Sequence, residues 1–320
     1  MHRLTFIILA IIINTAGSAQ PSFRDRSNSE YVRESSHIPP VDVPDTFPTI
    51  AYSSRAEALE WLRSIRIPDT SEYWPHIRAR EFLENLRLNV IHPVRMYQGT
   101  NTNFCGYAAF SYLPLHYDPL QYVQFMSSLY ANGVAEWHQI KFNPSEDVMA
   151  AAGTLHFKGV LDIHPADQMW FLALADHFRG YLNLFFTHFH SGSEDNFWAS
   201  CNLGKFNRMI KRMMGYKIKA IGSDLLRPGI KDLYAYLQRA VHTGTTFLYV
   251  NNTYLHVKDH DKSRFGFPTH FLVLTSIEKK DDVLTIVYWD YGGRTLRQVT
   301  TSFLKKILYG VTYIVKDKDG

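Results

Sequence analysis

Residues 269–291 read THFLVLTSIEKKDDVLTIVYWDY, two apolar runs that flank a charged interval. Both runs are rich in β-branched and aromatic residues, which favour strands, and the interval EKKDD at 278–282 predicts a hairpin turn. With the turn centred near Lys280, His270 is expected opposite Asp290, within a residue of register. Directly paired residues of an antiparallel ladder share a face, with Cβ atoms about 4.5–5.5 Å apart. The spacing therefore predicts contact between this imidazole and this carboxylate.

The flanking sequence extends the same pattern into a sheet. Strand-like runs lie at 245–257, 294–300 and 311–315, and a short helical segment lies at 302–310. Residues before them show mainly helical patterns, such as the segment that Ser54 can cap and the segment between Asp118 and Gly133. Helices first and strands last predict an α+β fold. A helical part, about 51–243, is expected to pack against a mainly antiparallel sheet at about 244–320.

The first fifty residues differ from the rest of the chain. Arg3 precedes an apolar run at 4–13, and small residues including Ala19 follow before Gln20. This pattern predicts a secretory signal peptide at 1–19, because about ten apolar residues are too few to span a bilayer comfortably; an uncleaved anchor is the alternative. Residues 20–50, rich in Ser, Pro and charged residues, are expected to form a flexible leader. The mature protein, with a folded domain at 51–320, is expected to be secreted or periplasmic, without a membrane contact.

The composition limits the classes of partner. At 320 residues with 46% hydrophobic side chains, the chain can bury a large core. Its formal net charge of +4 comes from scattered basic residues, which argues against a nucleic-acid partner. His188 and His190 have a spacing found in some metal sites, but no third ligand of suitable spacing accompanies them, so solvent-facing histidines are predicted. No cofactor or metal is predicted.

The stretch MYQGTNTNFCGYAAFSYLP at 96–114 places Cys105 at the predicted start of a helix, with Thr102 or Asn103 as its cap and Pro114 as its stop. Unpaired amides and the helix dipole stabilise a thiolate at that position, which is the nucleophilic form of cysteine. Gly106 permits a close approach of backbone or substrate. Gln98, seven residues upstream of the cysteine, could donate a hydrogen bond to a developing oxyanion.

A thiolate nucleophile also needs a base, and the base needs a group that orients it. The hairpin supplies both, in His270 and Asp290. The motif QGTNTNFCGYAA, followed far downstream by THFLVLTSI and YWDYG, resembles the papain-like cysteine peptidases. The resemblance implies that Cys105 is the nucleophile and that His270 is the general base and acid. It further implies that Asp290 orients the imidazole and that Gln98 helps to form the oxyanion hole.

The resemblance covers two short regions and includes three departures. Gln98 is one residue further from Cys105 than in papain, Asp290 stands where papain has an asparagine, and the helical segment between Cys105 and His270 is long. The expected function is an exported cysteine hydrolase that cleaves amide bonds of a protein, peptide or peptidoglycan. A deamidase or acyltransferase, as an effector or toxin, is an alternative with the same thioester chemistry.

A second alternative depends on Cys201, the other cysteine of the chain. An exported protein meets oxidising conditions, so Cys105 and Cys201 could form a disulfide in a non-catalytic binding domain. We favour Cys201 as a small buried hydrophobic residue, because a lone bridge is optional in a domain of this size. The sequence does not indicate an oligomeric state.

Overall fold

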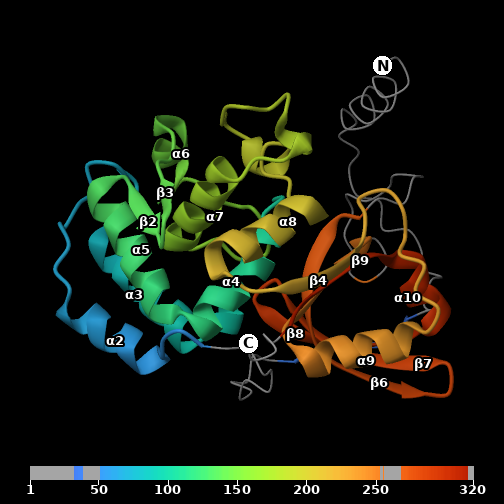
Figure 1. Cartoon of the computed structure of the whole chain (residues 1–320). Coiled ribbons are helices and arrows are strands. Elements are labelled where there is room, and N and C mark those ends of the chain that lie inside the picture. Colours follow the sequence, from blue (N-terminus) through green and yellow to red (C-terminus); the bar gives the residue numbers. More distant parts are fainter. Residues whose placement is uncertain (1–31, 39–50, 253–254, 256–267, 316–320) are drawn as a thin grey trace.

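The structure, a computed structural model, describes residues 32–38, 51–252, 255 and 268–315. Helices form one side of the molecule and an antiparallel sheet forms the other (Figure 1). This arrangement confirms the α+β class that the order of patterns predicts. The predicted signal peptide and leader residues 20–31 and 39–50 lie outside the described residues. No helix among the residues described is both long enough and apolar enough to cross a membrane.

Seven described strands form the main sheet, and every neighbouring pair is antiparallel. Their order across the sheet is β1-β8-β7-β6-β5-β9-β4. The strands are β1 (Val32–Ile38), β4 (Ile218–Gly222), β5 (Thr246–Val250), β6 (His270–Lys280), β7 (Val283–Asp290), β8 (Gly293–Thr300) and β9 (Leu308–Ile314). The hairpin of β6 and β7 therefore lies in the interior of the sheet, as its apolar pattern indicates.

Two edge strands come from segments that the sequence analysis did not assign to strands. β1 lies in the expected flexible leader and pairs with β8, and β4 lies in the expected helical part and pairs with β9. The leader prediction is thus wrong for residues 32–38. The physical reason is that an edge strand joins a sheet through backbone hydrogen bonds, which need no apolar alternation.

Alternate residues of the central strands face two separate hydrophobic clusters. On β6, Phe271 and Val273 pack with the helical side, whereas Leu272 and Leu274 pack under α9 (Leu233–Thr243) and α10 (Thr301–Ile307). This period of two is the strand geometry itself, in which successive side chains point to opposite faces. The sheet is consequently covered on both faces.

The helical side contains seven α-helices among the described residues. They are α2 (Arg55–Ser64), α3 (Ala79–Ile91), α4 (Cys105–Tyr117), α5 (Pro119–Asn132), α6 (Glu146–Ala151), α7 (Pro165–His177) and α8 (Leu203–Met209). A small hairpin of β2 (Ala135–Trp137) and β3 (Ile140–Phe142) follows α5. The predicted cap at Ser54 is present, with its side chain accepting from the Glu57 amide. Gly133 ends α5 at a φ of 71°, a conformation that glycine adopts readily.

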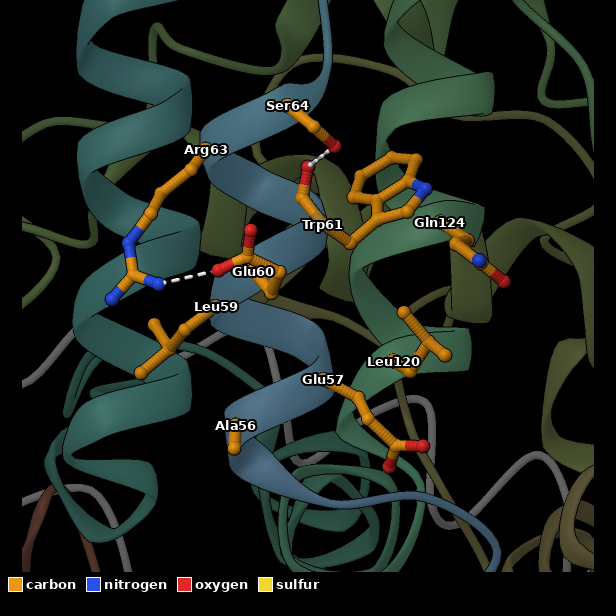
Figure 2. Close-up of a pocket in the computed structure, with 9 residues that line it drawn as sticks. All are labelled: Ala56, Glu57, Leu59, Glu60, Trp61, Arg63, Ser64, Leu120 and Gln124. Carbon is orange, nitrogen blue, oxygen red and sulfur yellow. Dashed lines mark hydrogen bonds and ion pairs between the residues drawn. The ribbon is translucent and has the colours of Figure 1, made fainter.

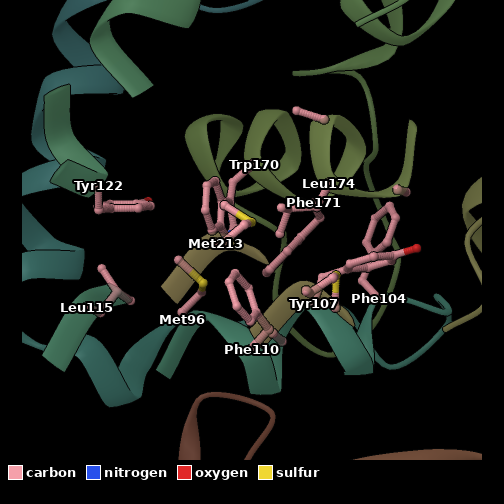
Figure 3. Close-up of a cluster of buried hydrophobic side chains, with 14 of the residues drawn as sticks. Met96, Phe104, Tyr107, Phe110, Leu115, Tyr122, Trp170, Phe171, Leu174 and Met213 are labelled. Atoms are coloured by element: carbon pink, nitrogen blue, oxygen red, sulfur yellow. The ribbon is translucent and has the colours of Figure 1, made fainter. Parts of the chain in front are cut away.

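α4 is the central helix of the molecule, and nearly every residue in it is buried. Figure 3 shows Tyr107 and Phe110 of this helix packed among the side chains of α7, such as Trp170 and Phe171. The helix also contacts β6 on its other side. A helix that is apolar all round is expected in exactly such an interior position between two layers.

The predicted stop at Pro114 is wrong, because α4 continues through it to Tyr117. A proline inside a helix removes one N–H donor and crowds the preceding turn. Here the next turn still forms, since the Asp118 amide donates to the Pro114 carbonyl at 2.9 Å. Burial of this turn between the helical layer and the sheet stabilises the helix by more than the lost hydrogen bond costs.

A buried carboxyl group lies within the helical layer. Asp167 of α7 is fully buried, and its Oδ1 accepts from Asn89 Nδ2 at 2.6 Å and from Asn85 Nδ2 at 3.3 Å. Its Oδ2 has no hydrogen-bond partner among the described residues. Burial raises the pKa of Asp167 to about 6. The charged form is therefore disfavoured in the folded protein.

The protein is expected to lose stability as the pH rises through the folded pKa of Asp167. Because that pKa lies above the unfolded value of about 3.9, the unfolded state ionises first, and the free energy of unfolding falls between about pH 4 and pH 7. Asp167→Asn should raise the free energy of unfolding at about pH 8 by about 1–3 kcal/mol and flatten this slope. Denaturant unfolding of the wild type and the variant at about pH 4 and about pH 8 measures the pH dependence of the free energy of unfolding. An unchanged pH dependence in the variant would contradict the assignment to Asp167.

Candidate active site

The structure brings His270 and Asp290 into direct contact. His270 Nε2 lies 2.9 Å from Asp290 Oδ2, and the two side chains are 1% and 3% exposed. A carboxylate can only accept a hydrogen bond, so a ring proton sits on Nε2, and in the neutral imidazole Nδ1 then presents a lone pair. This arrangement fixes the tautomer that a general base needs.

The predicted register, with His270 opposite Asp290 within one residue, is wrong, because the two residues lie two positions apart along the ladder. From Lys280 opposite Val283 to Ser276 opposite Val287, the two strands keep one register. The register then shifts by one residue, so that Leu274 lies opposite Tyr288. The extra residue is Thr275, whose hydroxyl donates to the Val287 carbonyl at 3.0 Å. Such a bulge moves all later side chains of one strand to the other face.

The bulge decides whether the two side chains can meet. Without it, the register near the turn would place Asp290 opposite Val273, on the face away from His270. With the bulge, Asp290 lies on the same face of the sheet as His270, and the two residues are offset by two positions along the ladder. Diagonal neighbours of this kind are about 7–8 Å apart at Cα and remain within reach of long side chains.

Cys105 is the first residue of α4 and is half-buried. Its Sγ lies 3.6 Å from the carbonyl oxygen of Thr269, the residue that immediately precedes His270. The first hydrogen bond of the helix runs from the Ala108 amide to the Phe104 carbonyl, so the earlier amides of the turn point toward the thiol end. The N-terminus of the central helix and the start of β6 thus meet at this cysteine.

The predicted capping of α4 by Thr102 or Asn103 is wrong. The capping position is Phe104, with no side-chain hydrogen bond. Thr102 instead donates to the Gln98 carbonyl at 2.7 Å, and Asn103 donates to the Asn196 carbonyl at 2.9 Å. Thr102 thus holds the loop before the helix together, and Asn103 ties that loop to the chain near residue 196. Neither side chain caps the first amides of α4, which can therefore bind an anionic group.

Gln98 lies in this loop with its side chain almost completely buried, at 1% exposure. Its Oε1 has no hydrogen-bond partner among the described residues. Gln168, equally buried, differs: its Oε1 accepts from the amides of Gly153 and Leu155, and its Nε2 donates to two carbonyls. Buried amides are normally satisfied in this way, and Gln98 Oε1 is an exception.

Tyr291, which the sequence analysis did not assign, completes the surroundings of the imidazole. Its ring stacks on that of His270, with centroids 4.7 Å apart and planes within 4°. Its hydroxyl lies 3.2 Å from His270 Nδ1. The residue directly follows Asp290 in the two-residue turn between β7 and β8, and this adjacency was the available signal.

Cys201 packs against Gly106, the residue after the nucleophile candidate, and is not joined to Cys105 by a disulfide. A Cβ atom added at Gly106 would lie 2.6 Å from Cys201 Cβ and 2.8 Å from its Sγ. The close approach that Gly106 was expected to permit is therefore the approach of Cys201. Burial raises the pKa of the Cys201 thiol to about 12, so this thiol remains protonated, as expected of a small buried hydrophobic residue.

Gly106→Ala should destabilise the protein by about 1–3 kcal/mol, because the new methyl group overlaps Cys201. In a Cys201→Gly background the same change should become neutral or stabilising, since alanine is then the better helix former. Denaturant unfolding of the four proteins in this cycle measures the coupling. Gly204→Ala is the control, because the nearest atom to a Cβ there is 3.6 Å away. Additive effects of Gly106→Ala and Cys201→Gly would contradict the contact.

The loop before Cys105 rests on two further loops. The Asn101 amide donates to the Lys158 carbonyl and the Asn103 amide to the Glu194 carbonyl, while Lys158 Nζ pairs with Glu194 Oε1 at 2.5 Å. The loop that holds Lys158 also exposes apolar side chains: Phe157 is 86% exposed, Val160 90% and Leu161 62%. An apolar surface therefore lies next to the segment that contains Gln98.

A surface pocket and a pair of histidines elsewhere among the described residues include none of the candidate site residues. A shallow pocket on α2 and α5, near Trp61 and Leu120, includes none of the candidate residues (Figure 2). His188 and His190 are exposed, as predicted. Among the residues described, no group of three or more His, Cys, Asp or Glu side chains is arranged to hold a metal ion.

Comparison with known proteins adds no neighbour: no protein-family model, curated protein or solved structure matches the chain. Functional inference consequently depends on the geometry around Cys105, His270 and Asp290.

Proposed function

We propose that the protein is an exported, papain-like cysteine hydrolase that cleaves amide bonds through a thioester on Cys105. The observations that support the proposal are two contacts at neighbouring residues of the chain. The Cys105 thiol, at the start of a buried helix, lies against the residue before His270, and His270 Nε2 is held by Asp290 at 2.9 Å. A nucleophile, a base and a group that orients the base are the minimum set for this chemistry.

In the proposed reaction, His270 Nδ1 takes the thiol proton and Cys105 Sγ attacks the carbonyl carbon of the amide. The tetrahedral oxyanion receives hydrogen bonds from the Cys105 amide and from Gln98 Nε2. His270 then gives the proton to the leaving amine, and a thioester remains on Cys105. Water, deprotonated by the same imidazole, hydrolyses the thioester and restores the thiol.

The surroundings of the loop bear on the substrate. The exposed side chains of Phe157, Val160 and Leu161 border the segment of Gln98, so a substrate with an apolar side chain near the scissile amide fits this rim best. Peptides and the peptide cross-links of peptidoglycan both meet this description. The expected location, outside the cytoplasm, gives access to both.

The test is release of amino groups from a panel of peptides with apolar residues and from purified peptidoglycan, with Cys105→Ala as the control. New primary amines with the wild type alone support the proposal. Ammonia release without chain cleavage would instead indicate deamidation, and incorporation of an added amine would indicate acyl transfer. Full activity in Cys105→Ala would overturn the assignment of the nucleophile and everything that depends on it.

A further inference from the structure

The loop at 98–104, which leads into α4, has no helix or strand of its own. Two of its backbone amides donate to carbonyl groups from other parts of the chain. The Asn101 amide donates to the Lys158 carbonyl at 2.9 Å, and the Asn103 amide donates to the Glu194 carbonyl at 2.8 Å. The path of this loop therefore depends on where those two carbonyl groups lie.

The loop also packs closely against the backbone around Lys158. A Cβ atom added at Gly99 would lie 2.8 Å from the Lys158 carbonyl oxygen, and one added at Gly159 would lie 2.7 Å from the Thr100 amide nitrogen. Atoms in a packed interior do not approach so closely, so the two glycines permit a contact that a larger residue would prevent. A displacement of either segment would consequently displace the other.

The segments that provide the two carbonyls are themselves irregular, and an ion pair joins them. Lys158 lies between α6 and α7, and Glu194 lies in the 3₁₀ turn Ser193–Asp195 between α7 and α8. Lys158 Nζ is 2.5 Å from Glu194 Oε1. The Glu194 side chain is 2% exposed, and its Oε2 has no hydrogen-bond partner among the described residues. Loss of the cation would leave a buried carboxylate uncompensated, which costs more than the loss of a surface pair.

These contacts close into a ring. The loop at 98–104 binds both carbonyls through its amides, and the side chains of the same two residues bind each other. We propose that Lys158 and Glu194 are positioning residues, whose ion pair fixes the path of this loop. The pair thereby sets the distance between the two oxyanion donors, Gln98 Nε2 and the Cys105 amide, so the inference rests on the proposed function. A misplacement of about 1 Å at such a site can lower the rate by about 10².

Glu194→Gln keeps the size of the buried side chain and removes its charge. We expect it to lower kcat for a cleaved peptide by about 10- to 100-fold and to change KM by less than about threefold, because the oxyanion forms only in the transition state. Glu194 suits this test better than Lys158, since the exposed apolar side chains of Phe157 and Val160 lie within two residues of Lys158. A kcat equal to that of the wild type would overturn the inference.

The two residues should act as one unit. Lys158→Met should lower kcat as Glu194→Gln does, and the double variant should be no slower than the slower single variant. Lys158→Arg keeps the charge and should keep most of the activity. Asp176→Asn is the control, because it breaks the 2.5 Å ion pair with Arg179 at the end of α7, which takes no part in the ring. Effects of the two single variants that multiply, or an equal loss of kcat in Asp176→Asn, would overturn the inference.

Hydrogen exchange gives a readout that does not depend on catalysis. The Asn101 and Asn103 amides should exchange at least about tenfold faster in Glu194→Gln than in the wild type, and at the wild-type rate in Asp176→Asn. Unchanged exchange at both amides in Glu194→Gln would overturn the inference. If the wild type releases no amine from any substrate, or Cys105→Ala remains fully active, the proposed function fails. The exchange rates then still decide whether the ion pair holds the loop.

Discussion

Iodoacetamide near neutral pH is expected to add one carbamidomethyl group to the protein, at Cys105, before Cys201 reacts. Burial raises the pKa of Cys201 to about 12. At about pH 7 its thiolate fraction is therefore on the order of 10⁻⁵, against roughly 3% for an ordinary thiol with a pKa of about 8.5. Cys105 should react more than about 10³ times faster than Cys201. Intact mass and peptide mapping of the mature protein measure both rates, and Cys105→Ala should lose the fast adduct.

Accessibility alone would give part of that difference, so the decisive comparison is with His270→Ala at about pH 6, where an ordinary thiol is well under about 1% thiolate. Loss of the imidazole should slow alkylation of Cys105 by at least about tenfold. Asp290→Ala should have a smaller effect, because the imidazole loses its orientation but keeps its chemistry. An equal rate in His270→Ala and the wild type would make Cys105 a merely exposed thiol.

The same sample tests the non-catalytic alternative. Titration of thiols under denaturing, non-reducing conditions should find both Cys105 and Cys201 as thiols, in agreement with the structure. If neither is titratable, the two cysteines are bonded to each other and the proposed hydrolase lacks its nucleophile.

The contact between His270 and Asp290 was predictable, but the register that makes it was not. The two apolar runs and the charged interval between them were enough to place a hairpin and to bring its open ends together. Nothing in the local pattern marks Thr275 as an extra residue, because a threonine suits a regular strand as well as a bulge. The predicted contact is present because the bulge restores the shared face that the turn alone would have removed.

The remaining differences between the predicted and the observed structure arise where tertiary contacts override the preference of a short segment. Pro114 is a helix breaker by sequence, yet the turn around it is buried between two layers and stays helical. Residues 32–38 lack an apolar alternation, yet the open edge of β8 offers backbone groups to pair with. Thr102 and Asn103 are good capping residues, but the loop before α4 uses them to hold its own shape. Sequence patterns report preferences of short segments. Pro114, residues 32–38 and Asn103 instead meet partners far along the chain, whereas Thr102 is held by the nearby Gln98 carbonyl.

Gln98→Ala is expected to lower turnover by roughly 10²–10³, the usual effect of removing one oxyanion donor, with little change in KM. The donor acts on charge that develops only in the transition state, so substrate binding should not depend on it. Alkylation of Cys105 by iodoacetamide passes through no carbonyl oxyanion and should be unaffected. Rates of amide cleavage and of alkylation, measured on the same variant, therefore separate oxyanion stabilisation from a general disturbance of the site.

Gln168→Ala is the matched control, because Gln168 is as buried as Gln98 but its amide is fully used by the fold. Removal of that side chain leaves buried backbone groups unpaired, which should reduce the free energy of unfolding by about 1–3 kcal/mol without a specific loss of turnover. Gln98→Glu adds a second comparison, since it keeps the shape of the side chain and removes its N–H donors. If Gln98→Ala lowers stability and alkylation together while Gln98→Glu turns over normally, Gln98 holds the loop and does not stabilise the oxyanion.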